Sequence, residues 1–134
     1  MKSIIIAVFV LLASTAFAQT DTEPQTVVVR LIDKSSAEWR FEPSHVTVKP
    51  GDTIQWVLED MVPHNVEFKK TPDGANLGDA RMGPFLMSRG QTYELVIDER
   101  FTEGAYDYVC TPHEAMGMKG SITVVSSNSE MATH

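Results

Sequence analysis

The chain contains one cysteine, Cys110, in a run of residues able to bind a metal ion. The run reads Cys-Thr-Pro-His-Glu-Ala-Met-Gly-Met, so the thiol is followed by the imidazole of His113 and by two thioethers. A second histidine, His64, lies well upstream in the sequence Pro-His-Asn. A thiolate, two imidazoles and a thioether are the donor set of a mononuclear blue-copper centre, with a trigonal His2Cys set and a weak axial methionine. The sequence therefore predicts one type 1 copper per chain.

The spacing of these donors indicates how such a site is built. Cys110 and His113 are three residues apart around a proline, so one short loop can turn both donors toward one point. Because His64 comes from elsewhere, the body of the fold must fix the geometry. Either Met116 or Met118 could supply the thioether. Without the rest of the motif, Cys110 is as well explained as a small hydrophobic core residue.

The N-terminal sequence indicates that the protein is exported. The compartment matters because it decides which roles a single cysteine can have. Residues 1–18 combine a short positive start, an apolar run and an Ala-Phe-Ala site, as in a secretory signal peptide. We therefore expect the mature chain to begin at Gln19, without a lipid anchor, and to reside in the periplasm. Exported proteins normally pair their cysteines in disulfides. A single cysteine in that compartment needs another role, and metal ligation provides one.

Chain length and net charge limit the number of domains and the kinds of partner. A mature chain of about 116 residues corresponds to one domain of ordinary size. The formal net charge of the full chain is −7, which argues against nucleic acids and anionic membrane surfaces as partners.

The elements that must position the donors are predicted to be strands. Short β-branched or alternating runs occur at 26–32, 45–48, 53–58, 66–68, 93–97, 106–109 and 121–125. Alternation places Ile54, Trp56 and Leu58 on one face of their strand. Residues 69–86 read as a long connection with one helical turn at 75–80, and 126–134 as a polar tail. This pattern predicts an all-β sandwich of seven or eight strands.

Several motifs carry a resemblance to a known family. They are Phe41-Glu42-Pro43, Gly51-Asp52-Thr53-Ile54, Pro63-His64-Asn65-Val66, Gly90-Gln91-Thr92-Tyr93, Cys110-Thr111-Pro112-His113 and Met118-Lys119-Gly120. With them, the chain resembles the cupredoxins of the plastocyanin and pseudoazurin type over nearly all of the predicted domain, 19–125. The resemblance implies an eight-stranded Greek-key sandwich with copper at one end.

The resemblance also implies roles for particular residues. The copper ligands would be His64, Cys110, His113 and Met118, which leaves Met116 as apolar packing near the site. Asn65 would tie the His64 segment to the cysteine loop through hydrogen bonds. The remaining histidines and the tryptophans are not expected to bind metal. We expect His45 to be a solvent-facing strand residue, His134 to be part of the tail, and Trp39 and Trp56 to be core or rim aromatics.

The function implied by the resemblance is one-electron shuttling between Cu(II) and Cu(I), without a bound substrate and therefore without enzyme activity. In the family, the loop histidine reaches the surface within an apolar patch, so His113 is the expected electron port. The patch would include Pro63, Met82, Pro84, Phe85, Met87 and Met116, although a lid on the core would explain these residues equally well.

Two departures from plant-type plastocyanin bear on the partners. Val109 replaces the exposed aromatic before the cysteine, and Lys69-Lys70 replaces an acidic cluster. A remote acidic docking site is therefore not expected. The expected partners are redox proteins that approach the His113 end of a monomer, such as a c-type cytochrome or a periplasmic copper or haem enzyme.

Two other functional classes remain open. A periplasmic copper carrier or storage protein would use the same soft donors and bind extra Cu(I) through methionines such as Met82, Met87, Met116 and Met131. An enzyme could use a Cys–His pair as a nucleophile, although four protein ligands would leave no open position for catalysis at the metal.

Overall fold

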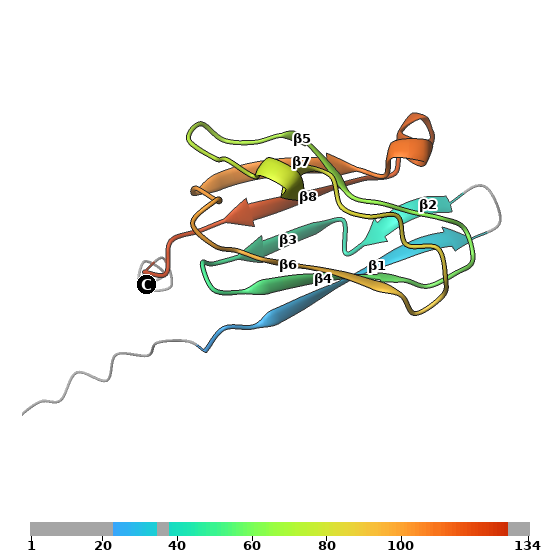
Figure 1. Cartoon of the computed structure of the whole chain (residues 1–134), viewed down its shortest axis with the longest axis horizontal. Helices are drawn as coiled ribbons and strands as arrows, with labels where there is room; N and C mark the ends of the chain where they lie inside the picture. The colour runs from blue at the N-terminus through green and yellow to red at the C-terminus, as the bar shows by residue number, and fades with distance from the viewer. Residues whose placement is uncertain (1–22, 35–37, 129–134) are drawn as a thin grey trace, which may run out of the picture.

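The computed structural model describes residues 23–34 and 38–128, which form two stacked four-stranded sheets (Figure 1). The elements are β1 (Thr26–Lys34), β2 (Glu38–Glu42), β3 (His45–Val48), β4 (Thr53–Leu58), β5 (Glu67–Lys70), the 3-10 helix η1 (Gly78–Arg81), β6 (Thr92–Val96), β7 (Gly104–Val109), the 3-10 helix η2 (Thr111–Met116) and β8 (Lys119–Val124). The predicted all-β sandwich is confirmed. The proposed signal peptide, Met131 and His134 lie outside the described residues, and the domain limits 19–125 and 126–134 stay predictions.

The topology brings distant parts of the chain to one end of the sandwich. The sheets have the orders β2-β1-β4-β6 and β3-β8-β7-β5. β1 is parallel to β4 and β3 is parallel to β8, while the other neighbours are antiparallel. From β2 to β7, every connection crosses from one sheet to the other. The β7–β8 connection instead joins neighbours in one sheet, and it contains the predicted metal loop.

The core lies between the sheets and follows the predicted alternation. Ile54, Trp56 and Leu58 of β4 are fully buried. The Trp56 ring stacks on Tyr93 with ring centroids 5.4 Å apart and meets the edge of Tyr108 at 5.7 Å. Removing these large apolar surfaces from water is the main term that favours the fold.

A close approach between β7 and β8 fixes the base of the metal loop. A Cβ added to Gly120 would lie 2.4 Å from the ring of Tyr108, so no larger residue fits without movement. The two residues are register partners in the β7–β8 ladder. Burial of the ring raises the pKa of Tyr108 to about 12. The Tyr108 ring therefore packs directly against the backbone of the strand that follows the loop.

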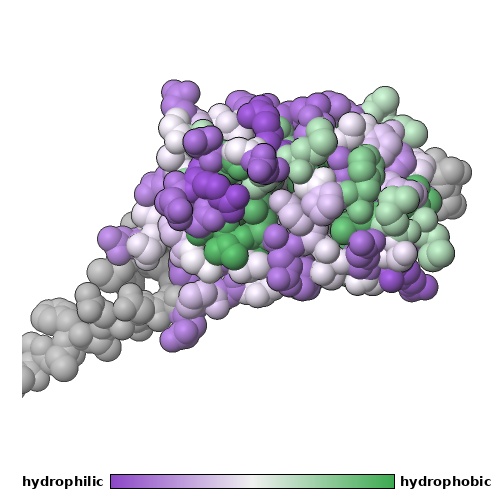
Figure 2. Space-filling view, in the orientation of Figure 1, coloured by the Kyte–Doolittle hydropathy of each residue, from purple (hydrophilic) through white to green (hydrophobic). Residues whose placement is uncertain are grey.

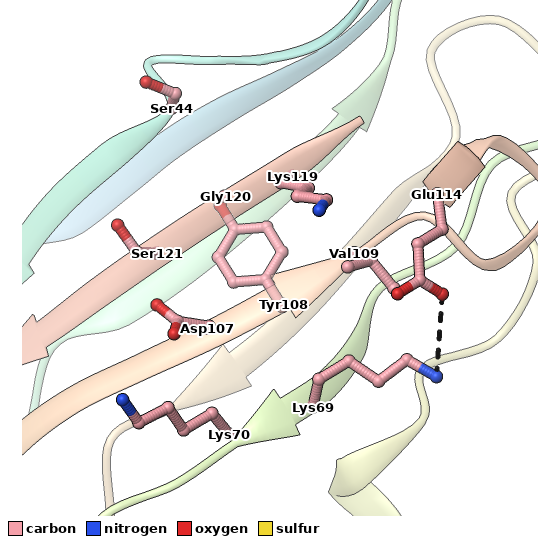
Figure 3. A pocket seen from close by; sticks show the side chains of 10 residues that line it. All are labelled: Ser44, Lys69, Lys70, Asp107, Tyr108, Val109, Glu114, Lys119, Gly120 and Ser121. Carbon is pink, nitrogen blue, oxygen red and sulfur yellow. Dashed lines mark ion pairs between the residues drawn. The ribbon is translucent and has the colours of Figure 1, made fainter. Parts of the chain in front are cut away.

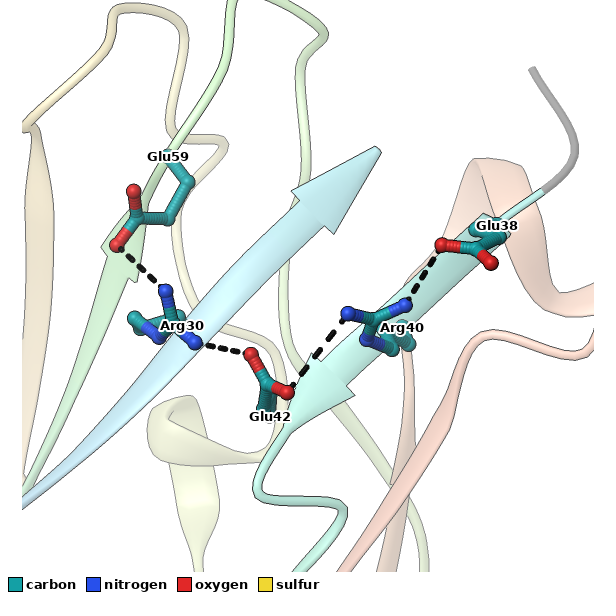
Figure 4. Close-up of polar contacts among 5 residues, drawn as sticks. All are labelled: Arg30, Glu38, Arg40, Glu42 and Glu59. Carbon is teal, nitrogen blue, oxygen red and sulfur yellow. Dashed lines mark hydrogen bonds and ion pairs between the residues drawn. The ribbon is translucent and has the colours of Figure 1, made fainter. Parts of the chain in front are cut away.

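The strand β2 was not predicted, since its sequence Glu-Trp-Arg-Phe-Glu is short and rich in charge. It pairs with β1, and its charged residues form ion pairs with that strand and its surroundings (Figure 4). Arg40 contacts Glu38 at 2.8 Å and Glu42 at 3.7 Å, and Arg30 of β1 contacts Glu42 and also Glu59 at 3.7 Å. Each exposed pair stabilises by only about 0–1 kcal/mol. These ion pairs keep the charged side chains of β2 on the outer surface. The aromatic side chains that alternate with them, Trp39 and Phe41, therefore face inward.

The long connection after β5 is more ordered than the sequence suggests. Its helical turn is η1, which begins three residues later than expected. Two isolated bridges, His64 with Leu86 and Glu67 with Met82, fasten it to the segment that carries the first predicted ligand. This connection therefore supports the site as well as covering the core.

Candidate metal centre

The predicted donors come from two segments. His64 lies between β4 and β5, where its backbone N–H donates to the Leu86 carbonyl at 3.1 Å and its carbonyl accepts from the Leu86 N–H at 2.8 Å. Cys110 follows β7 directly, and His113 belongs to η2. Met118 immediately precedes β8. His64 is therefore held in the connection that runs from one sheet to the other, and the remaining donors are held in the β7–β8 loop of a single sheet.

Three donor atoms converge on one point. His64 Nδ1 lies 3.0 Å from His113 Nδ1 and 3.4 Å from Cys110 Sγ, and Cys110 Sγ lies 3.3 Å from His113 Nδ1. The centre of such a triangle is about 2 Å from each atom, the distance at which first-row metals bind nitrogen and sulfur. All three side chains are buried. The residues present thus fit a trigonal His2Cys metal site.

Met118 is the methionine that the structure places beside this triangle. Its carbonyl accepts from the Cys110 N–H at 3.1 Å, and its own N–H donates to the His113 carbonyl at 3.2 Å. Its side chain is fully buried, whereas that of Met116 is 54% exposed. These contacts favour Met118 as the axial thioether, and ligation by all four residues stays a prediction.

A tight turn gives the loop its shape. The backbone N–H of His113 donates to the Cys110 carbonyl at 3.0 Å, and η2 then ends at Gly117 with φ of 84°. Only glycine adopts this left-handed conformation without strain. The Gly117 N–H donates to the Glu114 carbonyl at 3.0 Å. This reversal allows Met118 to return toward Cys110.

Asn65 has the bridging role expected of it. Its Nδ2 donates to Thr111 Oγ1 at 3.0 Å, and its Oδ1 accepts from the Thr111 backbone N–H at 2.8 Å. Thr111 Oγ1 in turn donates to Glu67 Oε2 at 2.9 Å. The side chain of Asn65 is buried. The predicted tie between the His64 segment and the cysteine loop is confirmed.

Burial keeps the two histidines neutral, the form in which imidazole binds metals. It lowers the pKa of His64, and charge on His113 lowers it further, while the carboxylates of Asp60 and Asp33 oppose both effects. Burial also lowers the pKa of His113, again against the two carboxylates. A metal ion therefore meets two unprotonated ring nitrogens.

Burial has the opposite effect on the thiol. It raises the pKa of Cys110, although hydrogen bonding from the backbone of Asn65 and His113 opposes that rise. A buried thiol without a cation is inert as a nucleophile, whereas a bound metal ion favours the thiolate. The environment of Cys110 therefore suits metal ligation better than covalent catalysis.

Trp39 is a site residue that sequence reasoning missed. Its ring stacks on His113 with centroids 3.9 Å apart and planes 20° apart, and its edge meets His64 at 5.9 Å. The sequence predicts only a core or rim aromatic at this position, without a role at the metal. The alternation of β2 places Trp39 on an inner face, but nothing in the sequence says which group that face meets.

The other candidates lie elsewhere. His45 is exposed, and its Nδ1 lies 2.8 Å from Ser121 Oγ, as expected for a solvent-facing strand residue. Within residues 23–34 and 38–128, the triad His64, Cys110 and His113 is the one cluster of three or more histidine, cysteine or acidic residues able to hold a metal ion. The same ranges contain no helix that is long and apolar enough to cross a membrane.

A surface groove of about 480 Å³ is separate from this centre (Figure 3). It lies over β5, β7 and β8, and lysines 69, 70 and 119 contribute to its wall together with Asp107 and Glu114. Lys69 pairs with Glu114 at 3.8 Å. None of the ten lining residues is a histidine, cysteine or methionine, so the groove has no soft metal donors.

Comparison with known proteins agrees with this geometry. Residues 28–125 match the family model for copper binding proteins of the plastocyanin/azurin family. The plastocyanin of Scenedesmus fuscus is 43% identical over 86 residues, which cover 63% of this chain and 85% of that relative. The structure of oxidised plastocyanin from Dryopteris crassirhizoma is 25% identical, with a TM-score of 0.59 over 74% of this chain and 100% of the other. Pseudoazurin from Methylobacterium extorquens AM1 is 32% identical, with a TM-score of 0.53 over 74% of each chain. The chain therefore belongs to the plastocyanin/azurin family of copper-binding proteins, the cupredoxins, as the motifs around His64 and Cys110 predict.

Proposed function

We propose that this protein is an exported electron carrier whose single copper is held by His64, Cys110, His113 and Met118. The observation that carries the proposal is the buried triangle of Nδ1, Nδ1 and Sγ atoms with edges of 3.0, 3.3 and 3.4 Å. Copper bound there supplies one-electron chemistry, because it exists as Cu(II) or Cu(I). No substrate needs to enter such a site, since the electron crosses the protein surface.

The surroundings of the donors suit electron transfer. Thiolate and thioether favour Cu(I) and imidazole is also suited to Cu(II), so the mixed set supports both states. Asn65 fixes the distance between the segment of His64 and the loop of Cys110. Trp39 packs on the ring of His113 and holds its orientation. A donor set fixed in this way changes little when one electron is added or removed.

An apolar surface at the same end supports docking of redox partners. Five of the seven large hydrophobic side chains that are exposed among the described residues lie in or beside the segments that build the metal centre: Met61, Met82, Phe85, Met87 and Met116. Figure 2 shows one group of hydrophobic residues toward the end at which η2 lies in Figure 1, and a second group in the other half of the same face. Because these side chains are about half exposed or more, they bury too little surface to act mainly as a lid on the core. Met61 adds to the patch expected from the sequence.

His113 is the proposed electron port beneath this surface. Its side chain is 7% exposed, so a partner that covers the patch comes close to the ring without displacing it. Small and transient interfaces are typical of such encounters. The partners we propose are a c-type cytochrome or a periplasmic copper or haem enzyme, meeting a monomeric carrier. Lys69-Lys70 replaces an acidic cluster and Val109 replaces an exposed aromatic, so we propose no remote acidic docking site.

The proposed location is the periplasm, to which residues 1–18 would direct the chain. The donors are buried and come from two segments far apart in the sequence, which makes ready release of copper to another protein difficult. This feature supports a carrier of electrons over a carrier of copper. It also supports a protein without enzyme activity, because four protein ligands leave no open position for a substrate.

The docking proposal is tested with Met116→Lys, compared with Val28→Lys on the exposed face of β1. The rate of reduction by a small c-type cytochrome is measured by stopped flow, together with the visible copper spectrum. We expect a tenfold or larger loss of rate for Met116→Lys, a smaller effect for Val28→Lys, and unchanged spectra. Equal rates for both variants would remove the docking assignment without affecting the metal centre.

A further inference from the structure

The imidazole of His64 has a second nitrogen that the metal centre does not use. Nδ1 faces Cys110 and His113, so Nε2 points away from them. Nε2 is buried, and within residues 23–34 and 38–128 it has no hydrogen-bond partner at normal distance. A buried N–H without an acceptor destabilises the folded protein. A ligating histidine almost always gives this second N–H to a carboxylate, a carbonyl or water.

The nearest carboxylate is that of Asp60, four residues earlier on the same segment. Its Oδ1 lies 3.6 Å from Nε2 of His64, and its side chain is 24% exposed. Two backbone N–H groups hold this carboxylate in place: Val62 donates to Oδ1 at 3.2 Å, and Asp33 donates to Oδ2. Asp60 is therefore anchored by the main chain, with one oxygen directed at the buried ring.

Among residues 23–34 and 38–128, no basic side chain neutralises the charge of Asp60. Within the described part of the chain, no lysine or arginine lies within ion-pair distance of it. Its neighbour Glu59 differs in this respect, because Glu59 faces Arg30 at 3.7 Å on the outer surface. Asp60 thus places a negative charge behind His64, and this charge has no lysine or arginine partner in the described part of the chain.

We propose that Asp60 is a positioning residue for the copper centre, accepting the Nε2–H of His64 and lowering the reduction potential through its negative charge. The hydrogen bond would select the tautomer in which Nδ1 is free to bind the metal, and it would fix the plane of the ring. The negative charge favours Cu(II), the state with the greater positive charge. This inference rests on the proposed role of His64 as a ligand.

The test compares Asp60→Asn with the matched control Glu59→Gln in the copper-loaded mature protein. Both variants remove one carboxylate charge from adjacent positions, and asparagine keeps one acceptor oxygen, so it can retain one of the two bonds from the backbone N–H groups of Val62 and Asp33. The ratio of reduced to oxidised copper is measured spectrally against a mediator of fixed potential. We expect this ratio to rise about tenfold in Asp60→Asn, which corresponds to about 59 mV for one electron. Glu59→Gln should change the ratio less than about twofold.

The outcomes separate this inference from the proposed function. An intense visible band in the unaltered protein reports on the copper site alone, and its absence would remove both proposals. If the band is present but Asp60→Asn shifts the ratio no more than Glu59→Gln does, the role of Asp60 is refuted and the copper site stands.

A second measurement covers the case in which Asp60→Asn does not fold. Nitrogen-15 NMR of the unaltered Cu(I) protein observes the Nε2–H of His64 directly. We expect a proton that exchanges slowly with water, because it is buried and hydrogen-bonded. An Nε2–H that exchanges as fast as that of a free imidazole would overturn the proposal.

Discussion

Replacing Asn65 by alanine tests whether one buried side chain joins the two halves of the metal centre. The variant loses the bond from Nδ2 to Thr111 Oγ1, at 3.0 Å, and the bond from the Thr111 N–H to Oδ1, at 2.8 Å. Each such bond stabilises by about 1 kcal/mol, and a partly buried N–H left without an acceptor adds a further cost. We therefore expect Asn65→Ala to lower the free energy of unfolding by roughly 2–3 kcal/mol.

The assay is urea unfolding of the copper-free mature chain, because bound metal would add its own binding energy to the stability. At this size the expected loss corresponds to a decrease in Tm of about 8–15 °C. Thr111→Val removes the hydroxyl but keeps the backbone N–H bond, so it should cost about 1 kcal/mol, less than Asn65→Ala. Asn76→Ala is the control, since the hydrogen bond recorded for Asn76 is made by its backbone N–H.

The result that would refute this reasoning is a loss in Asn65→Ala no greater than that in Asn76→Ala. The two bonds would then add nothing to the stability of the fold, and the loop would be held by its own turn and by β7 and β8. A loss in Thr111→Val equal to that in Asn65→Ala would be a different failure, because it would assign the whole effect to the hydroxyl.

Three further predictions concern other parts of the molecule. Trp39→Leu removes the ring stacked on His113, an interaction that contributes about 0.5–1.5 kcal/mol, so copper should dissociate several-fold faster in a chelator assay; an unchanged rate would contradict this role. For Asp52, burial alone would raise the pKa, but hydrogen bonds from two backbone N–H groups and the nearby lysine lower it overall. A lowered folded-state pKa means that the ionised carboxylate stabilises the fold above about pH 4 and that this gain is lost as the pH falls. Asp52→Asn should therefore be less stable than the unaltered protein at pH 7 and equally stable near pH 2; a constant difference in unfolding midpoint would refute this. Gly120→Ala forces a methyl group against Tyr108 and should cost about 1–3 kcal/mol in thermal unfolding, and full stability would show that the ring moves freely.

Much of the fold could be predicted from the sequence because alternation is a local signal. The buried residues Ile54, Trp56 and Leu58 were placed on one face from their spacing alone, and the structure confirms it. The strand β2 was missed, since five residues with three charges resemble a loop. Its place in the sheet depends on pairing with β1 and on ion pairs such as Arg40 with Glu38, which arise only after the chain has folded.

The metal centre shows the same limit. Cys110 and His113 are neighbours in one loop, so their spacing already indicated a shared site. The stacking of Trp39 on His113 and the approach of Asp60 to the far side of His64 are contacts between side chains whose directions are set by tertiary structure. Periodicity predicts which face a residue occupies, but not which group it meets there.

The central claim is that one copper is bound by a thiolate together with two imidazoles. The most direct measurement is the visible spectrum of the mature protein titrated with Cu(II) and then with ascorbate, alongside Cys110→Ser. We predict an intense thiolate-to-copper band that saturates at one equivalent, disappears on reduction, returns on oxidation and is absent in the variant. A weak or missing band, or binding beyond one equivalent, would contradict the account and would favour a protein that carries copper rather than electrons.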